Sequence, residues 1–342
     1  MMFDMTLLNQ HRKALMGFAI LWITLYHCIA GPVTALGIPV LAPVLNYGWL
    51  GVDIFLFLSG IGLYFSMSHN ASAGAFYKRR IRRVVIPWLV LSLPYWIIKT
   101  MILDGMRFRA MLLNWSGASF WLFGVKSVWY VAFLLVLYAL YPLIFRIQKQ
   151  HPLCIRVLIA GAFVLNIVML NAVPDYYGKT ELAFTRIPVF LFGSLTGAFL
   201  QAKPRKKLPV FPLCYLAAMI LLFFAGVFLA DDPAAGAALM MQRLGGQGTA
   251  LAVTAGLCLL LNRQTMQPLR KLLDFFGGFT LELYLLHVFL GYFAEQLGFD
   301  DAQRIPVQFL VQTAVVVLSV AGAWAFSRLM SRIRHQPAPQ KP

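Results

Sequence analysis

Two histidines lie inside segments that are otherwise apolar enough to cross a membrane, and they are the first candidates for chemistry. His27 ends the stretch "GFAILWITLYH", and His287 ends "FTLELYLLH" near the other end of the chain. An imidazole in hydrocarbon costs free energy unless it has hydrogen-bond partners. A neutral imidazole accepts a proton near pH 7, which makes His27 a candidate general base. The alternative is a histidine that is bonded to a neighbouring helix for packing alone.

Asp53 is the first candidate partner for His27. At 1.5 Å per residue, His27 lies about 20 Å above residue 14 and about 9 Å from the outer end of its helix. Asp53 enters the next helix from the same side, about 6 Å below residue 49. A carboxylate beside His27 would fix its tautomer and stabilise its cation. The competing interpretation of Asp53 is an acid at the level of the lipid headgroups.

The segment of His287 carries two further polar groups, Glu282 and Tyr284. His287 lies about 15 Å above residue 277, so its depth is within about 5 Å of that of His27 and the two can share a cavity. Tyr284, His287 or a backbone amide can also donate a hydrogen bond to an oxyanion that develops in a reaction. Glu282 is either a substrate-binding acid or an acid at the inner boundary that pairs with a loop arginine.

A run of basic residues precedes the third apolar segment, in "FYKRRIRRVVIPWL". Arg80 and Arg83 share one helical face, as do Arg79 and Arg82. Arginine forks suit phosphomonoester and pyrophosphate oxygens, so the run is a candidate site for a phosphorylated ligand. The alternative is charge that sets membrane topology. We expect Pro87 to break or kink the helix after the run.

Three residues near the outer boundary are candidates for substrate binding, together with Glu282. Trp129 and Tyr130 open "VWYVAFLLVLYALYPL" and also suit an aromatic belt. Arg186 stands at the outer edge of its apolar segment, which is the side that the positive-inside rule disfavours, so it favours a specific partner.

The composition indicates a membrane protein rather than a soluble domain. The 342 residues are 60% hydrophobic and 12% charged, whereas soluble chains carry roughly 25% charged residues. The sequence predicts an all-α, polytopic bundle of about ten transmembrane helices. The predicted spans are 14–33, 49–67, 84–103, 128–146, 153–171, 187–200, 208–229, 248–262, 279–296 and 305–326.

Basic residues predict that both termini are cytoplasmic. With that orientation, 21 of the 29 Lys and Arg residues lie inside, as the positive-inside rule requires. The net charge of +17 then reflects topology and anionic membrane lipid, and we expect no nucleic-acid partner. The four cysteines lie in apolar segments without CxxC spacing, so we expect no metal site. We expect one membrane domain over 1–334 and a disordered cytoplasmic tail over 335–342.

These segments resemble, in order, the motifs of membrane acyltransferase family 3, the bacterial O-acyltransferases that modify cell-envelope sugars. The first-helix motif ends at His27, and "GWLGVDIFLFLSG" resembles the second-helix signature. "RRIRRVVIPW" resembles the arginine-pair and proline motif, with Arg80 and Arg83 in the positions of the pair. "VWYVAFLLVLYALYPL", "RIPVFLFGSLTG" and "FTLELYLLH" fit later blocks.

The chain departs from this pattern at one position. The family typically has an arginine eleven positions before the first-helix histidine, where this chain has Met16. Arg12, one helical turn nearer the cytoplasm, can reach towards that place by snorkelling. The hydrolase-like domain that some members carry at the C-terminus is absent from this sequence, so we expect the membrane module alone.

The resemblance implies an integral protein of the bacterial inner membrane that takes an acyl group, usually acetyl, from cytoplasmic acetyl-CoA. The acceptor would be a hydroxyl of an envelope polysaccharide or a lipid-linked sugar. His27, Asp53, His287 and Tyr284 would then form the catalytic group. The coenzyme's phosphates would bind to Arg80, Arg83, Arg79, Arg82 and Arg12, and no metal is implied.

Two other functions are consistent with the same residues. A proton-coupled transporter or flippase for an envelope glycan precursor would also use intramembrane His, Asp and Glu. Against it, we find no inverted halves with matching broken helices, and a transporter does not need the arginine run before Pro87. A catalytically inactive scaffold is the other alternative, motivated by Met16.

Overall fold

The structure is a computed structural model that describes residues 4–202, 210–228, 236–298 and 305–335. Within these ranges the chain forms helices and no strands. The N-terminal half contains α1 (Thr6–Gln10), α2 (Arg12–Cys28), α3 (Ala30–Ala35), α4 (Leu41–Asn46), α5 (Leu50–His69), α6 (Ala73–Arg80), η1 (Ile81–Val85), α7 (Ile86–Trp96), η2 (Ile97–Leu103), α8 (Phe108–Ser116), α9 (Ala118–Phe123), η3 (Lys126–Val128) and α10 (Trp129–Gln150). The C-terminal half contains α11 (Cys154–Ala172), α12 (Pro174–Phe184), α13 (Ile187–Ala202), α14 (Val210–Phe228), α15 (Gly236–Leu261), η4 (Gln264–Met266), α16 (Gln267–Phe276), α17 (Thr280–Gln296) and α18 (Ile305–His335).

The predicted helical membrane bundle is confirmed, whereas the count of ten spans is not. Every predicted span contains a helix, but among the described residues seven helices are long and apolar enough to cross a membrane. The count rises to eight if α16 and α17, which meet at a bend of 68°, form one span. α2 has only 17 residues, which is at the lower limit for a spanning helix. The predicted tail begins at the last residue of α18 and otherwise lies outside the described residues.

The boundaries of several predicted spans differ from the structure; the first was predicted to end at residue 33, for example, but α2 ends at Cys28. The eighth was predicted to begin at residue 248, but α15 begins at Gly236 and takes in "QRLGGQG". Polar residues and glycines lower the hydropathy of that stretch, although they are helical and mostly buried. Arg243 therefore lies within a membrane-length helix rather than in an outer loop. The sixth span was predicted as 187–200, whereas α12 and α13 together form a span of 29 residues.

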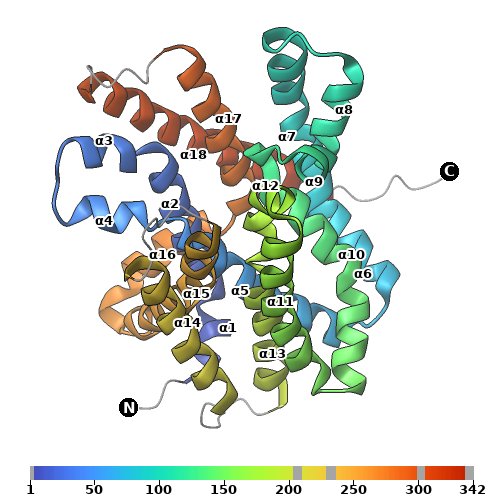
Figure 1. Cartoon of the computed structure of the whole chain (residues 1–342). Helices are drawn as coiled ribbons and strands as arrows, with labels where there is room; N and C mark the ends of the chain where they lie inside the picture. The colour runs from blue at the N-terminus through green and yellow to red at the C-terminus, as the bar shows by residue number, and fades with distance from the viewer. Residues whose placement is uncertain (1–3, 203–209, 229–235, 299–304, 336–342) are drawn as a thin grey trace.

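α5 is the central helix of the bundle (Figure 1). In the most apolar stretch of α5, 78% of the residues are buried inside the protein, whereas in that of α18 only 17% are. α5 packs against α2, α10, α13 and α15. α5 and α13 cross so closely that a Cβ on Gly193 would lie 2.1 Å from the carbonyl oxygen of Phe57, and only glycine fits there. Such close approach of small residues is typical of membrane helix pairs.

The outermost helices carry their apolar side chains on the surface. Val157 and Ile167 of α11 are 67% and 52% exposed, and Leu310 and Val317 of α18 are 67% and 61% exposed. Soluble proteins rarely expose apolar patches on this scale. These surfaces are therefore suited to contact with lipid chains.

The helix that carries the arginine run does not break at Pro87. Residues from Ala73 to Leu103 form one membrane-length helix, and a π-helical turn, Ile81–Val85, ends two residues before the proline. Proline has no N–H to close the bond to the carbonyl four residues earlier, and a wider turn accommodates that loss. Such single π-turns occur frequently at functional sites.

Candidate active site

A cavity of about 180 Å3 lies between α2, α5, α10, the start of α17 and the segment that carries Arg80 and Arg83. The end lined by these arginines is on the side predicted to face the cytoplasm. The cavity extends along α2 from Arg12 to Ile23 and along α5 from Leu63 to Val52. Eleven residues of helix correspond to about 16 Å. The two helices run antiparallel, and the cavity is therefore a shaft along the bundle.

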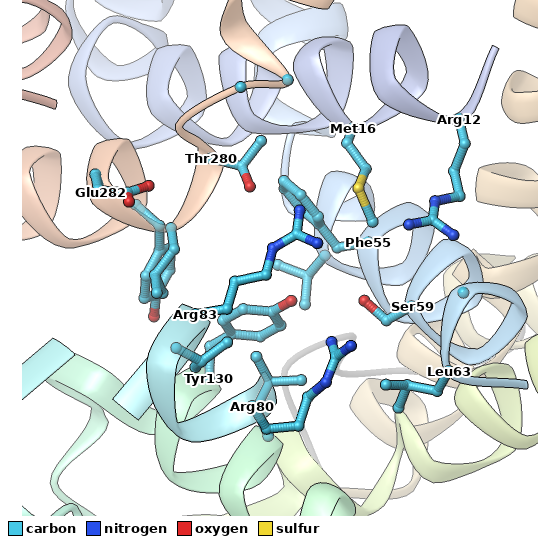
Figure 2. Close-up of a pocket in the computed structure, with 18 of the residues that line it drawn as sticks. Arg12, Met16, Phe55, Ser59, Leu63, Arg80, Arg83, Tyr130, Thr280 and Glu282 are labelled. Atoms are coloured by element: carbon cyan, nitrogen blue, oxygen red, sulfur yellow. The ribbon is translucent and has the colours of Figure 1, made fainter. Parts of the chain in front are cut away.

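Three guanidinium groups point into one end of the shaft, from Arg12, Arg80 and Arg83 (Figure 2). Figure 2 places Ser59 between them and Glu282 on the far side of Arg83. The aromatic rings of Phe76 and Tyr138 hold Arg80, with its Cζ 5.5 Å and 5.7 Å from the two ring centroids. Three cations and one carboxylate line the cavity, so its charge favours a ligand with several negative charges.

Arg12 reaches the cavity in the way that its position before Met16 suggested. Both residues line the cavity. A Cβ on Gly62 would lie 2.4 Å from Nη1 of Arg12. The absence of a side chain at Gly62 therefore leaves the space that the Arg12 guanidinium occupies.

The basic run divides into two pairs with different surroundings. Arg80 and Arg83 line the cavity, whereas Arg79 and Arg82 do not. Nη2 of Arg79 instead donates to the backbone carbonyl of Ser66 at 3.4 Å. The spacing of three residues therefore separates a cavity-facing pair from a pair on another face.

The other end of the shaft is lined by apolar and aromatic residues, and it stops about one helical turn short of the two histidines. Ile23 precedes His27 by four residues, and Tyr284 precedes His287 by three. The ring of Tyr284 contacts that of Tyr130, with centroids 5.2 Å apart, and that of His287, at 5.7 Å. The two tyrosines stand between the cavity and the histidine pair.

The two histidines are direct partners. Nδ1 of His27 lies 2.9 Å from Nε2 of His287, and the rings stack at 18° with centroids 5.1 Å apart. His287 is buried, with 1% of its surface exposed, whereas His27 keeps part of its ring exposed. The structure thus joins residues 260 positions apart, as their matching depths suggested.

Asp53 is not the partner of His27 in the described part of the chain. Its Oδ1 lies 3.6 Å from Nε of Arg186, and both side chains are almost completely buried. This corrects the expectation that Asp53 orients the His27 ring. α2 and α5 are neighbours, but the side chain of Asp53 lies against Arg186, at the junction between α12 and α13.

Asp53 and Arg186 belong to a larger outer charge cluster. Its other ion pairs join Glu181 to Arg243, at 3.0 Å, and to Lys126, at 3.7 Å. The guanidinium of Arg186 also stacks on the ring of Trp129, 5.1 Å from its centroid. The expected specific partner of Arg186 is therefore a buried carboxylate and an aromatic ring. Of the predicted acceptor residues, Tyr130 and Glu282 line the cavity instead.

We expect Asp53→Ala to lower the free energy of unfolding by about 3 kcal/mol or more, because it leaves the Arg186 charge buried without its carboxylate. Asp104→Ala is the matched control, since Asp104 pairs with Lys99 in a partly exposed position and should cost about 1 kcal/mol or less. Thermal unfolding of detergent-purified protein measures both. Equal losses of stability in the two variants would show that the buried ion pair contributes no more to the free energy of unfolding than the partly exposed one.

Residues 14–328, nearly the whole chain, match the acyltransferase domain that defines acyltransferase family 3. The chain belongs to acyltransferase family 3. No curated protein and no solved structure gave a significant match. The family indicates an acyltransferase activity. Together with the seven or eight membrane-length helices of the described residues, it indicates a multi-pass membrane protein.

Residues from several motif blocks of this acyltransferase family 3 protein line the shaft or lie just beyond its end. The first-helix block supplies His27, the arginine-pair block supplies Arg80 and Arg83, and the last block supplies Tyr284 and His287. The blocks lie far apart in sequence, so their convergence depends on helix packing.

Several residues around the site were not singled out from the sequence. Ser59 belongs to "SGIG", which indicates close helix packing, yet Ser59 also lines the cavity. Thr280 opens α17 at the cavity wall. Glu181 and Arg243 were missed as partners in the outer charge cluster. Hydropathy assigns the stretch around Arg243 to an outer loop, so no signal in the sequence indicated that this arginine lies in a membrane-length helix.

Proposed function

We propose that this protein moves an acyl group, acetyl in the first instance, from acyl-CoA on the cytoplasmic side to a hydroxyl of a cell-envelope glycan or lipid-linked sugar. The observation that supports this most directly is a cavity with three guanidiniums at one end and the His27–His287 pair one turn beyond the other. A polyanionic donor with a long thin arm fits that distribution of charge and shape. The membrane would be the bacterial inner membrane.

The donor's phosphates would bind to Arg12, Arg80 and Arg83 through charge-assisted hydrogen bonds. The first turn of α17 begins at the same cavity, and its N-terminal N–H groups favour an anion. The pantetheine arm is about as long as five extended residues, roughly 17 Å. This is close to the length of the shaft along α2, about 16 Å, and so brings the thioester to the Tyr130–Tyr284 end.

His27 would act as the general base. It takes the proton of the acceptor hydroxyl as the oxygen attacks the thioester carbonyl, and it returns that proton to the departing thiolate. The hydroxyl of Tyr284 or a backbone amide would stabilise the oxyanion. Transfer requires the Tyr130–Tyr284 end of the shaft to admit the acyl group to the histidine pair.

The test is binding and transfer with detergent-purified protein and isotopically labelled acetyl-CoA. We expect saturable binding of acetyl-CoA and much weaker binding of S-acetylpantetheine, which lacks the phosphates that the arginines recognise. Label should then enter the envelope glycan of membranes that contain the protein. No binding at millimolar acetyl-CoA would overturn the donor assignment and favour a transporter. Binding without any transfer would favour the inactive scaffold.

A further inference from the structure

We propose that His287 is a positioning residue that fixes the tautomer of His27, so that Nε2 of His27 is the atom that accepts the proton. This inference rests on the proposed function for its role in the reaction. The tautomer itself follows from the hydrogen bonds alone and can be measured without any turnover.

The argument begins at a backbone carbonyl. Nδ1 of His287 lies 2.9 Å from the carbonyl oxygen of Leu283, one turn earlier in α17. A carbonyl oxygen only accepts, so Nδ1 of His287 carries a hydrogen and donates it. A neutral imidazole carries one N–H, and Nε2 of His287 therefore presents a lone pair.

That lone pair determines the state of His27. Nδ1 of His27 lies 2.9 Å from Nε2 of His287, so it must donate its hydrogen to that atom. The remaining nitrogen of His27, Nε2, then has no hydrogen and is free to accept one. In the other tautomer two lone pairs would face each other at 2.9 Å, which is repulsive.

Burial holds this arrangement in place. His287 is 1% exposed and Leu283 is completely buried, and the ring of Tyr284 packs against that of His287 edge to face. A neutral imidazole can orient His27 without placing a charge in the membrane. A carboxylate in the same position would bury a negative charge there. When His27 gains a proton, its bond to His287 becomes charge-assisted and strengthens.

The same bonds limit what else His287 can do. Its only N–H is directed at Leu283, so it has none to offer to an oxyanion. Of the three oxyanion donors considered from the sequence, Tyr284 and a backbone amide remain. His287 acts on the reaction through His27 and is not itself a proton acceptor for substrate.

The test compares His287→Gln with His287→Leu. A glutamine oxygen can take the place of Nε2 and accept from His27, whereas leucine cannot. We expect His287→Leu to lower kcat about 10²-fold or more, as expected when a base loses its tautomer, with acetyl-CoA affinity unchanged. His287→Gln should keep kcat within about tenfold of wild type. Retained acetyl-CoA binding in each variant shows that it is folded.

The tautomer is read directly from long-range ¹H–¹⁵N spectra of protein labelled with ¹⁵N-histidine. The chain has six histidines, and His27→Gln identifies the signal of interest. We expect His27 to be protonated at Nδ1 in wild type and to lose that preference in His287→Leu. Protonation of His27 at Nε2 in wild type, or equal kcat in wild type and His287→Leu, would overturn the proposal. Wild type with the expected tautomer but no acyl transfer would refute the proposed function alone.

Discussion

His27→Ala is expected to lower the rate of acyl transfer by about 10²- to 10⁴-fold, the usual contribution of a general base. Donor affinity should stay at the wild-type value, because Arg12, Arg80 and Arg83 lie at the opposite end of the shaft from His27. The loss should therefore appear in kcat and not in the dissociation constant of acetyl-CoA. Initial rates of label transfer and equilibrium binding on the same preparation separate the two quantities.

His151→Ala is the matched control for this variant. His151 lies in the turn between α10 and α11 and is exposed, so its removal should leave the rate unchanged. The amount of each variant in the membrane is measured beside the rate, since a lower protein level would mimic a catalytic loss. A wild-type rate in His27→Ala would remove this histidine from the reaction and leave it a packing role.

Arg80→Ala/Arg83→Ala is expected to weaken acetyl-CoA binding by at least about 10²-fold. A hydrogen bond to a charged group contributes about 1.5–3 kcal/mol. The loss of two such bonds therefore raises the dissociation constant by at least about 10²-fold. The remaining cation of the cavity, Arg12, should give residual binding. Titration of purified protein with labelled acetyl-CoA measures the change.

The structure supplies a control that separates recognition from topology. Arg79→Ala/Arg82→Ala removes the same charge from the same run but takes no side chain from the cavity lining. It should leave donor affinity within a few fold of wild type. Both double variants reduce the positive charge that orients the helix, so accessibility labelling of the termini should respond equally. Equal loss of binding in the two variants would mean that the run acts only through its overall charge.

The sequence by itself determined the class of this protein and the depth of its polar groups. Hydropathy and the placement of basic residues are local properties, and they sufficed for a helical membrane bundle. The 1.5 Å rise per residue placed His27 and His287 at matching depths before any contact was known. The spacing of Arg80 and Arg83 likewise predicted a shared face, and both line the cavity.

The length of individual helices was less accessible to sequence reasoning. α15 includes "QRLGGQG", which reads as a loop by hydropathy. Its glycines are needed where α14 passes, since a Cβ on Gly245 would lie 2.1 Å from the backbone nitrogen of Phe223. Polar residues there are satisfied by neighbouring helices rather than by water, and hydropathy does not register such partners.

Only the tertiary structure decided which polar groups meet. The depth of His27 restricts its partners to one layer of the bundle, and Asp53 and His287 are both predicted to lie near that layer. Rotation of each helix about its axis chooses between them, and it is set by close contacts such as that of Gly193 with Phe57. In the structure Asp53 lies against Arg186, and His287 lies against His27. Hydrophobic periodicity is weak in helices that are apolar on all sides, so the lateral arrangement of this site resides in packing and not in the sequence pattern.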